Sequence, residues 1–157
     1  MFTKYLTVFF ISMVPLIELR GAIPVALGMG LPTIPAIIVC AIGNMLPVPF
    51  IYFFARKFLV WGENKPYIGK VCRFFLEKGQ RAGQKLVAKT GRGGLAAALL
   101  IFVGVPLPGT GAWTGTLGAS FLDMGFKSTV ASVSLGVVLA GVIMSVVSLL
   151  GLHIFGL

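Results

Sequence analysis

Four apolar stretches divide this chain, and proline and glycine break two of them. Residues 33–55 and 128–150 would each form about 34 Å of helix, enough to cross a hydrocarbon core of roughly 30 Å. Residues 3–14 and 94–105 reach only about 18 Å before a break, which is too short to cross. Charged residues are 11% of the chain, against about 25% in an ordinary soluble domain. The sequence therefore predicts an all-α polytopic membrane protein with one domain, residues 1–157.

The two breaks share residues at matching positions. The Val-Pro-Leu of residues 14–16 returns at residues 105–107, and an offset of 90 residues then aligns Gly21 with Gly111. Each break lies between a short apolar arm and a full span. We therefore expect two repeats, each a re-entrant helical hairpin followed by one transmembrane helix, with inverted orientations as in many secondary transporters.

The expected order of segments assigns a role to each part of the chain. It is a re-entrant hairpin at 3–31, a transmembrane helix at 33–55, a basic amphipathic cytoplasmic segment at 56–92, a second re-entrant hairpin at 94–122 and a transmembrane helix at 128–150. Four kinked spans with both termini in the cytoplasm are the alternative, and the two topologies place Lys127 on opposite sides. We expect no cleaved signal peptide, because charged residues follow the first apolar arm directly, without a small-residue cleavage site.

The net charge of +9 comes mainly from one segment. Ten of the 13 lysine and arginine residues lie between residues 56 and 92. This follows the positive-inside rule, so we expect that segment in the cytoplasm and no nucleic-acid partner. Ile68, Cys72 and Leu76 have helical spacing, which predicts an amphipathic helix over residues 64–90 that binds membrane lipids through anionic headgroups. A solvated basic face that only sets topology is the alternative.

Glu18 and Arg20 lie at the first break, where a lone charge costs about 2.5–3.5 kcal/mol on insertion scales. We interpret Glu18 as a proton or cation site and Arg20 as a clamp for an anion such as phosphate, whose oxygens match the planar guanidinium. The structural alternatives are mutual neutralisation of the two charges or a position at the membrane interface.

The second break carries hydroxyl groups and glycines in place of charges. Its candidate binding residues are Pro106, Pro108, Gly109, Thr110, Gly111 and Thr114. Unwound backbone at membrane depth must line a cavity or be buried in protein. The helix that follows would direct its first N–H groups toward an anion, although Gly111 and Gly115 would equally serve close helix packing. Asn44 in the first full span is a candidate substrate contact or an interhelical hydrogen-bonding residue.

Catalytic and metal chemistry have no matching pattern in the sequence. His153 is isolated from other ligands, and no nucleophile has a base nearby. We therefore expect no enzymatic activity, no cofactor and no metal site.

Three motifs carry a resemblance to a known family. Pro-Leu-Ile-Glu-Leu-Arg-Gly-Ala-Ile-Pro at residues 15–24, Gly-Asn at 43–44 and Pro-Leu-Pro-Gly-Thr-Gly-Ala-Trp-Thr-Gly at 106–115 resemble the small multidrug export protein family, a branch related to the DedA and VTT-domain membrane proteins. The resemblance covers nearly the whole chain and adds Pro24 to the candidate site.

The resemblance implies a multi-pass protein of a bacterial or archaeal cytoplasmic (inner) membrane, with two facing hairpins. It implies an ion- or proton-coupled secondary transporter of an amphipathic substrate. The wider DedA group implies a lipid translocase for polyprenyl phosphate or phospholipid, but Thr110 stands where that group often has an acid. A non-transporting membrane assembly protein is a third hypothesis. Because so small a unit encloses little surface, a homodimer is also considered.

Overall fold

The computed structural model describes residues 1–90 and 94–154, where all regular elements are helices. The helices are α1 (Phe2–Met13), α2 (Glu18–Gly28), α3 (Thr33–Met45), α4 (Val48–Phe50), the π-helix η1 (Ile51–Ala55), α5 (Arg56–Gly62), α6 (Gly69–Thr90), α7 (Leu95–Gly104), α8 (Ala112–Phe121) and α9 (Phe126–Ile154). Thr33–Ala55 and Phe126–Gly151 are long and apolar enough to cross a membrane. The all-helical fold with two such segments is thus confirmed. Residues 91 and 92 of the basic segment lie outside the described residues.

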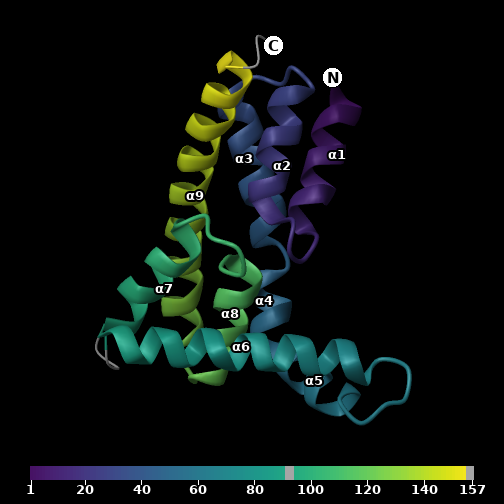
Figure 1. Ribbon diagram of the computed structural model, residues 1–157, viewed down its shortest axis with the longest axis vertical. Helices are drawn as coiled ribbons and strands as arrows, with labels where there is room; N and C mark the ends of the chain where they lie inside the picture. The colour runs from purple at the N-terminus through teal and green to yellow at the C-terminus, as the bar shows by residue number, and fades with distance from the viewer. Residues whose placement is uncertain (91–93, 155–157) are drawn as a thin grey trace.

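Two short antiparallel helix pairs pack against the long helix α9 (Figure 1). The pair α1 and α2 occupies the upper half of the molecule, and the pair α7 and α8 occupies the lower half. The segment from α3 to η1 descends beside them, and α6 lies across the lower end against α8. The N-terminus and the end of α9 both lie at the upper end.

The first long segment changes its helical form near its middle. Pro47 and Pro49 have no N–H to donate, and their rings clash with carbonyls one turn back, so α3 gives way to α4 and the π-helix η1. Ser120 Oγ donates to the Tyr52 carbonyl at 3.0 Å, and the Tyr52 hydroxyl donates to the Met124 carbonyl. These bonds connect the irregular helix to α8 and the loop after it.

Glycines allow the first helix of each pair to approach a long segment closely. A Cβ atom on Gly43 of α3 would lie 2.6 Å from the Phe9 carbonyl oxygen of α1. One on Gly136 of α9 would lie 2.8 Å from the Leu100 carbonyl oxygen of α7. Backbones that approach so closely require small residues, as at many helix contacts in membranes.

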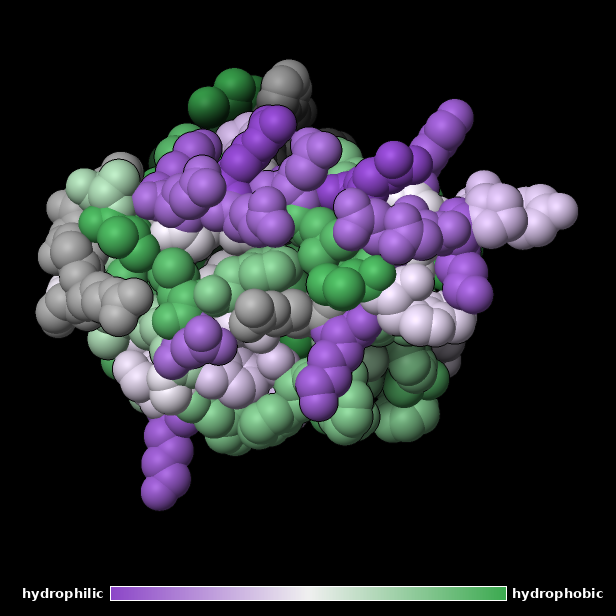
Figure 2. Space-filling view, turned by 90° about the horizontal axis from the view of Figure 1, so that it is seen from below, coloured by the Kyte–Doolittle hydropathy of each residue, from purple (hydrophilic) through white to green (hydrophobic). Residues whose placement is uncertain are grey.

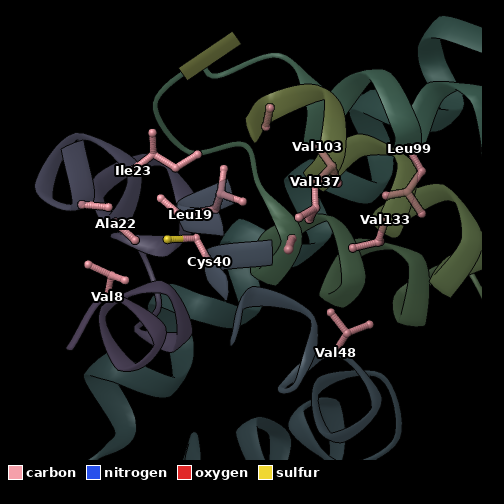
Figure 3. Close-up of a cluster of buried hydrophobic side chains, with 14 of the residues drawn as sticks. Val8, Leu19, Ala22, Ile23, Cys40, Val48, Leu99, Val103, Val133 and Val137 are labelled. Atoms are coloured by element: carbon pink, nitrogen blue, oxygen red, sulfur yellow. The ribbon is translucent and has the colours of Figure 1, made fainter. Parts of the chain in front are cut away.

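The buried core contains side chains from both helix pairs and from the two long segments. Figure 3 shows one group of fully buried side chains around α2 and another between α7 and α9. The first comprises Val8, Leu19, Ala22, Ile23 and Cys40, and the second comprises Leu99, Val103, Val133 and Val137. Both groups belong to one cluster of buried side chains, so a shared apolar core joins the two helix pairs.

Rows of apolar side chains on α3 and α9 face outward. They include Ile34, Ile38 and Ile42, then Val138, Val142 and Val146, each one helical turn from the next. Monomeric soluble proteins rarely expose contiguous apolar surface of this kind. These rows are the surface expected of helices that contact lipid.

The lower end of the molecule is hydrophilic over α6. Figure 2 shows hydrophilic side chains gathered there, with hydrophobic side chains between them. Lys70 and Arg73 are exposed on α6, and so are Val71 and Phe74. The helix begins at Gly69 and not at residue 64: Pro66 disfavours helical backbone at Lys65, and residues 66–68 form a turn.

Candidate functional site

The turns of the two helix pairs meet beside the middle of α9 (Figure 1). We name residues 14–17 the first turn and residues 105–111 the second turn. Leu16 and Glu18 have left-handed backbone, with φ of 76° and 52°, although neither is glycine. Such conformations cost about 1–3 kcal/mol each and need support from their surroundings. At Glu18, hydrogen bonds to the start of α8 provide this support.

The Glu18 carboxylate caps the N-terminus of α8. Its Oε2 accepts from the Ala112 N–H at 3.1 Å, and its Oε1 accepts from the Trp113 N–H at 3.0 Å. The first N–H groups of a helix lack intrahelical acceptors and form its positive end. A side chain of the first pair therefore satisfies two backbone donors of the second, at a residue only 5% exposed.

Gly111 makes that approach sterically feasible. Its φ is 139°, and a Cβ atom there would lie 2.2 Å from Glu18 Oε2. L-residues other than glycine are almost absent from this backbone region. Both the backbone conformation and the position of the carboxylate thus require glycine here.

The Arg20 guanidinium binds the other end of the second turn. Nη1 donates to the Leu107 carbonyl at 2.5 Å, and Nη2 donates to Thr110 Oγ1 at 2.7 Å. Nη2 also lies 3.3 Å from the Val103 carbonyl oxygen and 3.4 Å from that of Val105. These carbonyls stand at the C-terminal end of α7, which carries the negative end of the helix dipole.

The two charges therefore have a more specific arrangement than the sequence suggests. The N-terminus of α8 does face an anion, and that anion is the carboxylate of Glu18. Arg20, interpreted from sequence as an anion clamp, here holds backbone carbonyls and the Thr110 hydroxyl. Each charge is thus paired with backbone groups of the opposite helix pair.

A pocket of about 270 Å³ lies beside these contacts. The sequence-predicted residues that line it are Glu18, Arg20, Pro106, Pro108, Gly109, Thr110 and Thr114. Gly111 lies against the Glu18 carboxylate but does not line the pocket. Pro24 lies on the exposed side of α2, away from this lining. Asn44 is buried outside the lining, and its Oδ1 has no hydrogen-bond partner in the described part of the chain.

Sequence reasoning missed the other seven lining residues, which are Pro15, Leu16, Phe75, Lys78, Leu107, Trp113 and Met144. Trp113 Nε1 donates to the Met13 carbonyl at 3.2 Å, which joins α8 to the end of α1. In the sequence, only the position of Trp113 within the motif at residues 106–115 pointed to this residue. Lys78 reaches the pocket from α6, and nothing in the sequence separates it from the other cations of the basic segment.

Comparison with known proteins places the chain in a family. A family model described as "Putative small multi-drug export protein" matches residues 18–143, which include Glu18, Arg20 and the whole second turn. No curated protein and no solved structure matches the chain. The family model covers well over half of the chain, which is a membrane protein by the apolar surface and length of its helices. The chain therefore belongs to the small multi-drug export protein family.

Proposed function

We propose that this protein is a secondary membrane transporter of an amphipathic substrate, coupled to protons or another ion, and not an enzyme. The observation that carries the proposal is the meeting of the two turns. Charged groups inside an apolar helical molecule hold broken backbone beside a pocket. Intramembrane charges and discontinuous helices are the usual constituents of transport sites.

Glu18 is the proposed coupling residue. An ionised carboxylate accepts from both N–H groups of α8, whereas a protonated one carries a donor that must find another partner. Protonation would therefore weaken the contact between the two turns. Arg20 is the proposed restraint on the second turn, which would move when that contact changes.

Inverted repeats are supported by corresponding contacts in the two halves. The close contacts of Gly43 with Phe9 and of Gly136 with Leu100 join the first helix of each pair to its own long segment. Arg20 and Thr110, which bond to each other, are 90 residues apart, the offset that aligns the two breaks. The pairs also enter from opposite ends of the molecule (Figure 1). In a membrane this arrangement would make both pairs re-entrant.

Cysteine labelling in intact bacterial cells tests that topology. A single cysteine at Gly125, in a background with Cys40 and Cys72 replaced by alanine, is expected to react with an impermeant maleimide only after permeabilisation. A cysteine at Gly28 is expected to react from outside. A Cβ atom at either glycine meets nothing within 4 Å, so both substitutions suit the fold. Labelling of both sites from outside would support four kinked spans.

A flux assay on reconstituted protein tests the transport proposal. Proteoliposomes with an imposed pH gradient are given ethidium or 1-anilinonaphthalene-8-sulfonate, and trapped pyranine reports proton movement. We expect gradient-dependent flux of at least one probe. Coupled flux should be largely lost in Glu18→Gln, because a glutamine side chain cannot take up and release the coupled proton.

Two variants make the flux result interpretable. Arg20→Lys keeps the charge but loses the planar fork, so we expect reduced flux in a protein that still folds. Glu77→Gln changes an exposed carboxylate that pairs with Arg81 at 3.4 Å, and it should transport normally. Full coupled flux in both Glu18→Gln and Arg20→Lys would contradict the roles given to these residues.

A lipid translocase is the second candidate, and the rim of the pocket favours it. Leu16 and Leu107 line the pocket and are 62% and 56% exposed. Apolar side chains exposed at membrane depth would face lipid, which gives a lipid molecule lateral access. Dithionite quenching of a fluorescent phospholipid in the same proteoliposomes would detect such translocation. Absence of both solute and lipid movement would favour a membrane assembly protein.

A further inference from the structure

Two pockets of different chemistry adjoin each other at the second turn. The first is the charged pocket of about 270 Å³ already described, and the second is an apolar pocket of about 310 Å³. Pro15, Phe75 and Trp113 line both. Every described residue that lines the second pocket is apolar, apart from Cys72 with its thiol. The junction thus places a charged compartment next to an apolar one.

The charged compartment favours an anion. Arg20 and Lys78 line it against Glu18, which leaves an excess of one positive charge. Glu18 and Arg20 are already engaged by backbone groups. The Lys78 ammonium lies over the Phe74 ring, 5.3 Å from its centroid, and has no carboxylate within ion-pair distance in the described part of the chain.

Lys78 is also placed to reach the turn itself. A Cβ atom on Gly109 would lie 3.5 Å from Lys78 Cε and 3.8 Å from Nζ. Thr110 and Thr114 line the same pocket, but their hydroxyls donate to the Leu107 and Gly109 carbonyls. An anionic group there would therefore meet the Lys78 ammonium group beside the unwound turn.

We propose that the two pockets form one site for a single-chain amphipathic anion, with its charged head at Lys78 and its apolar tail between Phe75, Cys72 and Leu59. This inference names the substrate class of the proposed transporter. It rests on the proposed function only in calling the bound anion a substrate. The anion would be either a soluble organic anion or a membrane lipid with an anionic head, since both present the same chemistry.

Tryptophan fluorescence offers a direct binding assay. Trp61→Phe removes the other tryptophan, which is 60% exposed on α5, and leaves Trp113 at the junction. The full chain is placed in phosphatidylcholine nanodiscs and titrated with decyl phosphate or decyltrimethylammonium. We expect saturable change with decyl phosphate and none with the cation. Lys78→Gln should weaken binding about tenfold, the usual effect of losing a hydrogen bond to a charged group.

Lys70→Gln is the matched control, because Lys70 is exposed on the same helix and does not line either pocket. Its affinity should stay within about twofold of the parent, the level of a screened surface charge. Equal weakening by Lys70→Gln and Lys78→Gln would reduce the effect to surface electrostatics and overturn the proposal. Equal binding of the cationic probe would overturn it as well.

The apolar pocket is tested by chain length. From hexyl to decyl phosphate, affinity should rise about fourfold per methylene, equivalent to about 0.8 kcal/mol. Ala55→Leu, which fills part of that pocket, should flatten this dependence, while the same series with empty discs corrects for partitioning. An unchanged dependence in Ala55→Leu would show that the tail lies elsewhere and overturn the two-pocket site.

Two further comparisons complete the test. One identifies the source of the anion, and the other distinguishes failure of the site from failure of the transport proposal. Phosphatidylglycerol in the discs should compete with decyl phosphate if the natural ligand is a lipid, and should have no effect if it is a soluble anion; either result supports the class. Binding is measured without flux. Lys78-dependent binding without any flux would therefore refute the transporter and keep the site, whereas flux with Lys78-independent binding would refute the site alone.

Discussion

Replacing Glu18 with alanine is expected to destabilise the protein by about 3 kcal/mol, because two backbone donors, one buried and one partly buried, lose a charged acceptor. These donors are the N–H groups of Ala112 and Trp113 at the start of α8. For a chain of this size, such a loss lowers the melting temperature by roughly 6–12 °C. Thermal unfolding of the purified protein in detergent, followed by circular dichroism, measures the shift.

Two comparisons separate this cap from a general effect of charge. Glu18→Gln keeps one acceptor oxygen, so we expect a loss of stability between those of the parent and Glu18→Ala. Glu77→Ala removes an exposed carboxylate whose partner is Arg81, and exposed pairs of this kind contribute at most about 1 kcal/mol. If Glu18→Ala had the same melting temperature as Glu77→Ala, the Glu18 carboxylate would not hold the two helix pairs together.

The outline of the fold could be predicted because apolar length is a local property. Hydrophobicity over residues 33–55 and 128–150 marks two segments that reach across a membrane, and the structure has Thr33–Ala55 and Phe126–Gly151. The change of helical form within the first segment follows from Pro47 and Pro49. The predicted orientation of the two pairs in a membrane still awaits the labelling experiment.

Half of the residues that line the charged pocket could also be predicted from the sequence. Glu18 and Arg20 stand out because charges are costly in an apolar segment. Apart from the Thr110 hydroxyl, their partners are backbone groups more than 80 residues away, which could not be predicted. Backbone N–H and C=O groups occur at every residue, so no side-chain pattern marks the ones that a distant charge will meet.

Lys78 could not be predicted for a different reason. All ten cations of residues 56–92 satisfy the positive-inside rule equally well. Only the packing of α6 against α8 brings Lys78 to the second turn while Lys70 stays exposed. Similarly, the sequence offered close packing as one reason for Gly111 and Gly115. A Cβ atom on Gly115 would indeed meet Val103 at 2.8 Å, whereas Gly111 accommodates the carboxylate of Glu18.

Gly111→Ala is expected to destabilise the protein by on the order of 4 kcal/mol, since it combines a backbone conformation restricted to glycine with loss of the α8 cap. The new Cβ would lie 2.2 Å from Glu18 Oε2, so the carboxylate must leave. Gly28→Ala is the control, because a Cβ atom there meets nothing within 4 Å. The same thermal unfolding assay should show almost no change for this control.

A double-mutant cycle separates the two causes of the Gly111 effect. In Glu18→Ala there is no carboxylate to displace, so Gly111→Ala should then cost only the backbone strain. We expect the double variant to be more stable than the sum of the single losses by about 3 kcal/mol, because the cap is then lost once and not twice; this is the upper end of the range for residues in direct contact. Strict additivity would mean that the methyl group and the carboxylate do not meet, and that Gly111 is needed for its backbone conformation alone. A coupling of the expected size would instead establish that Glu18, directly after the first turn, caps α8 in the folded protein, which is the contact on which the proposed coupling role of Glu18 depends.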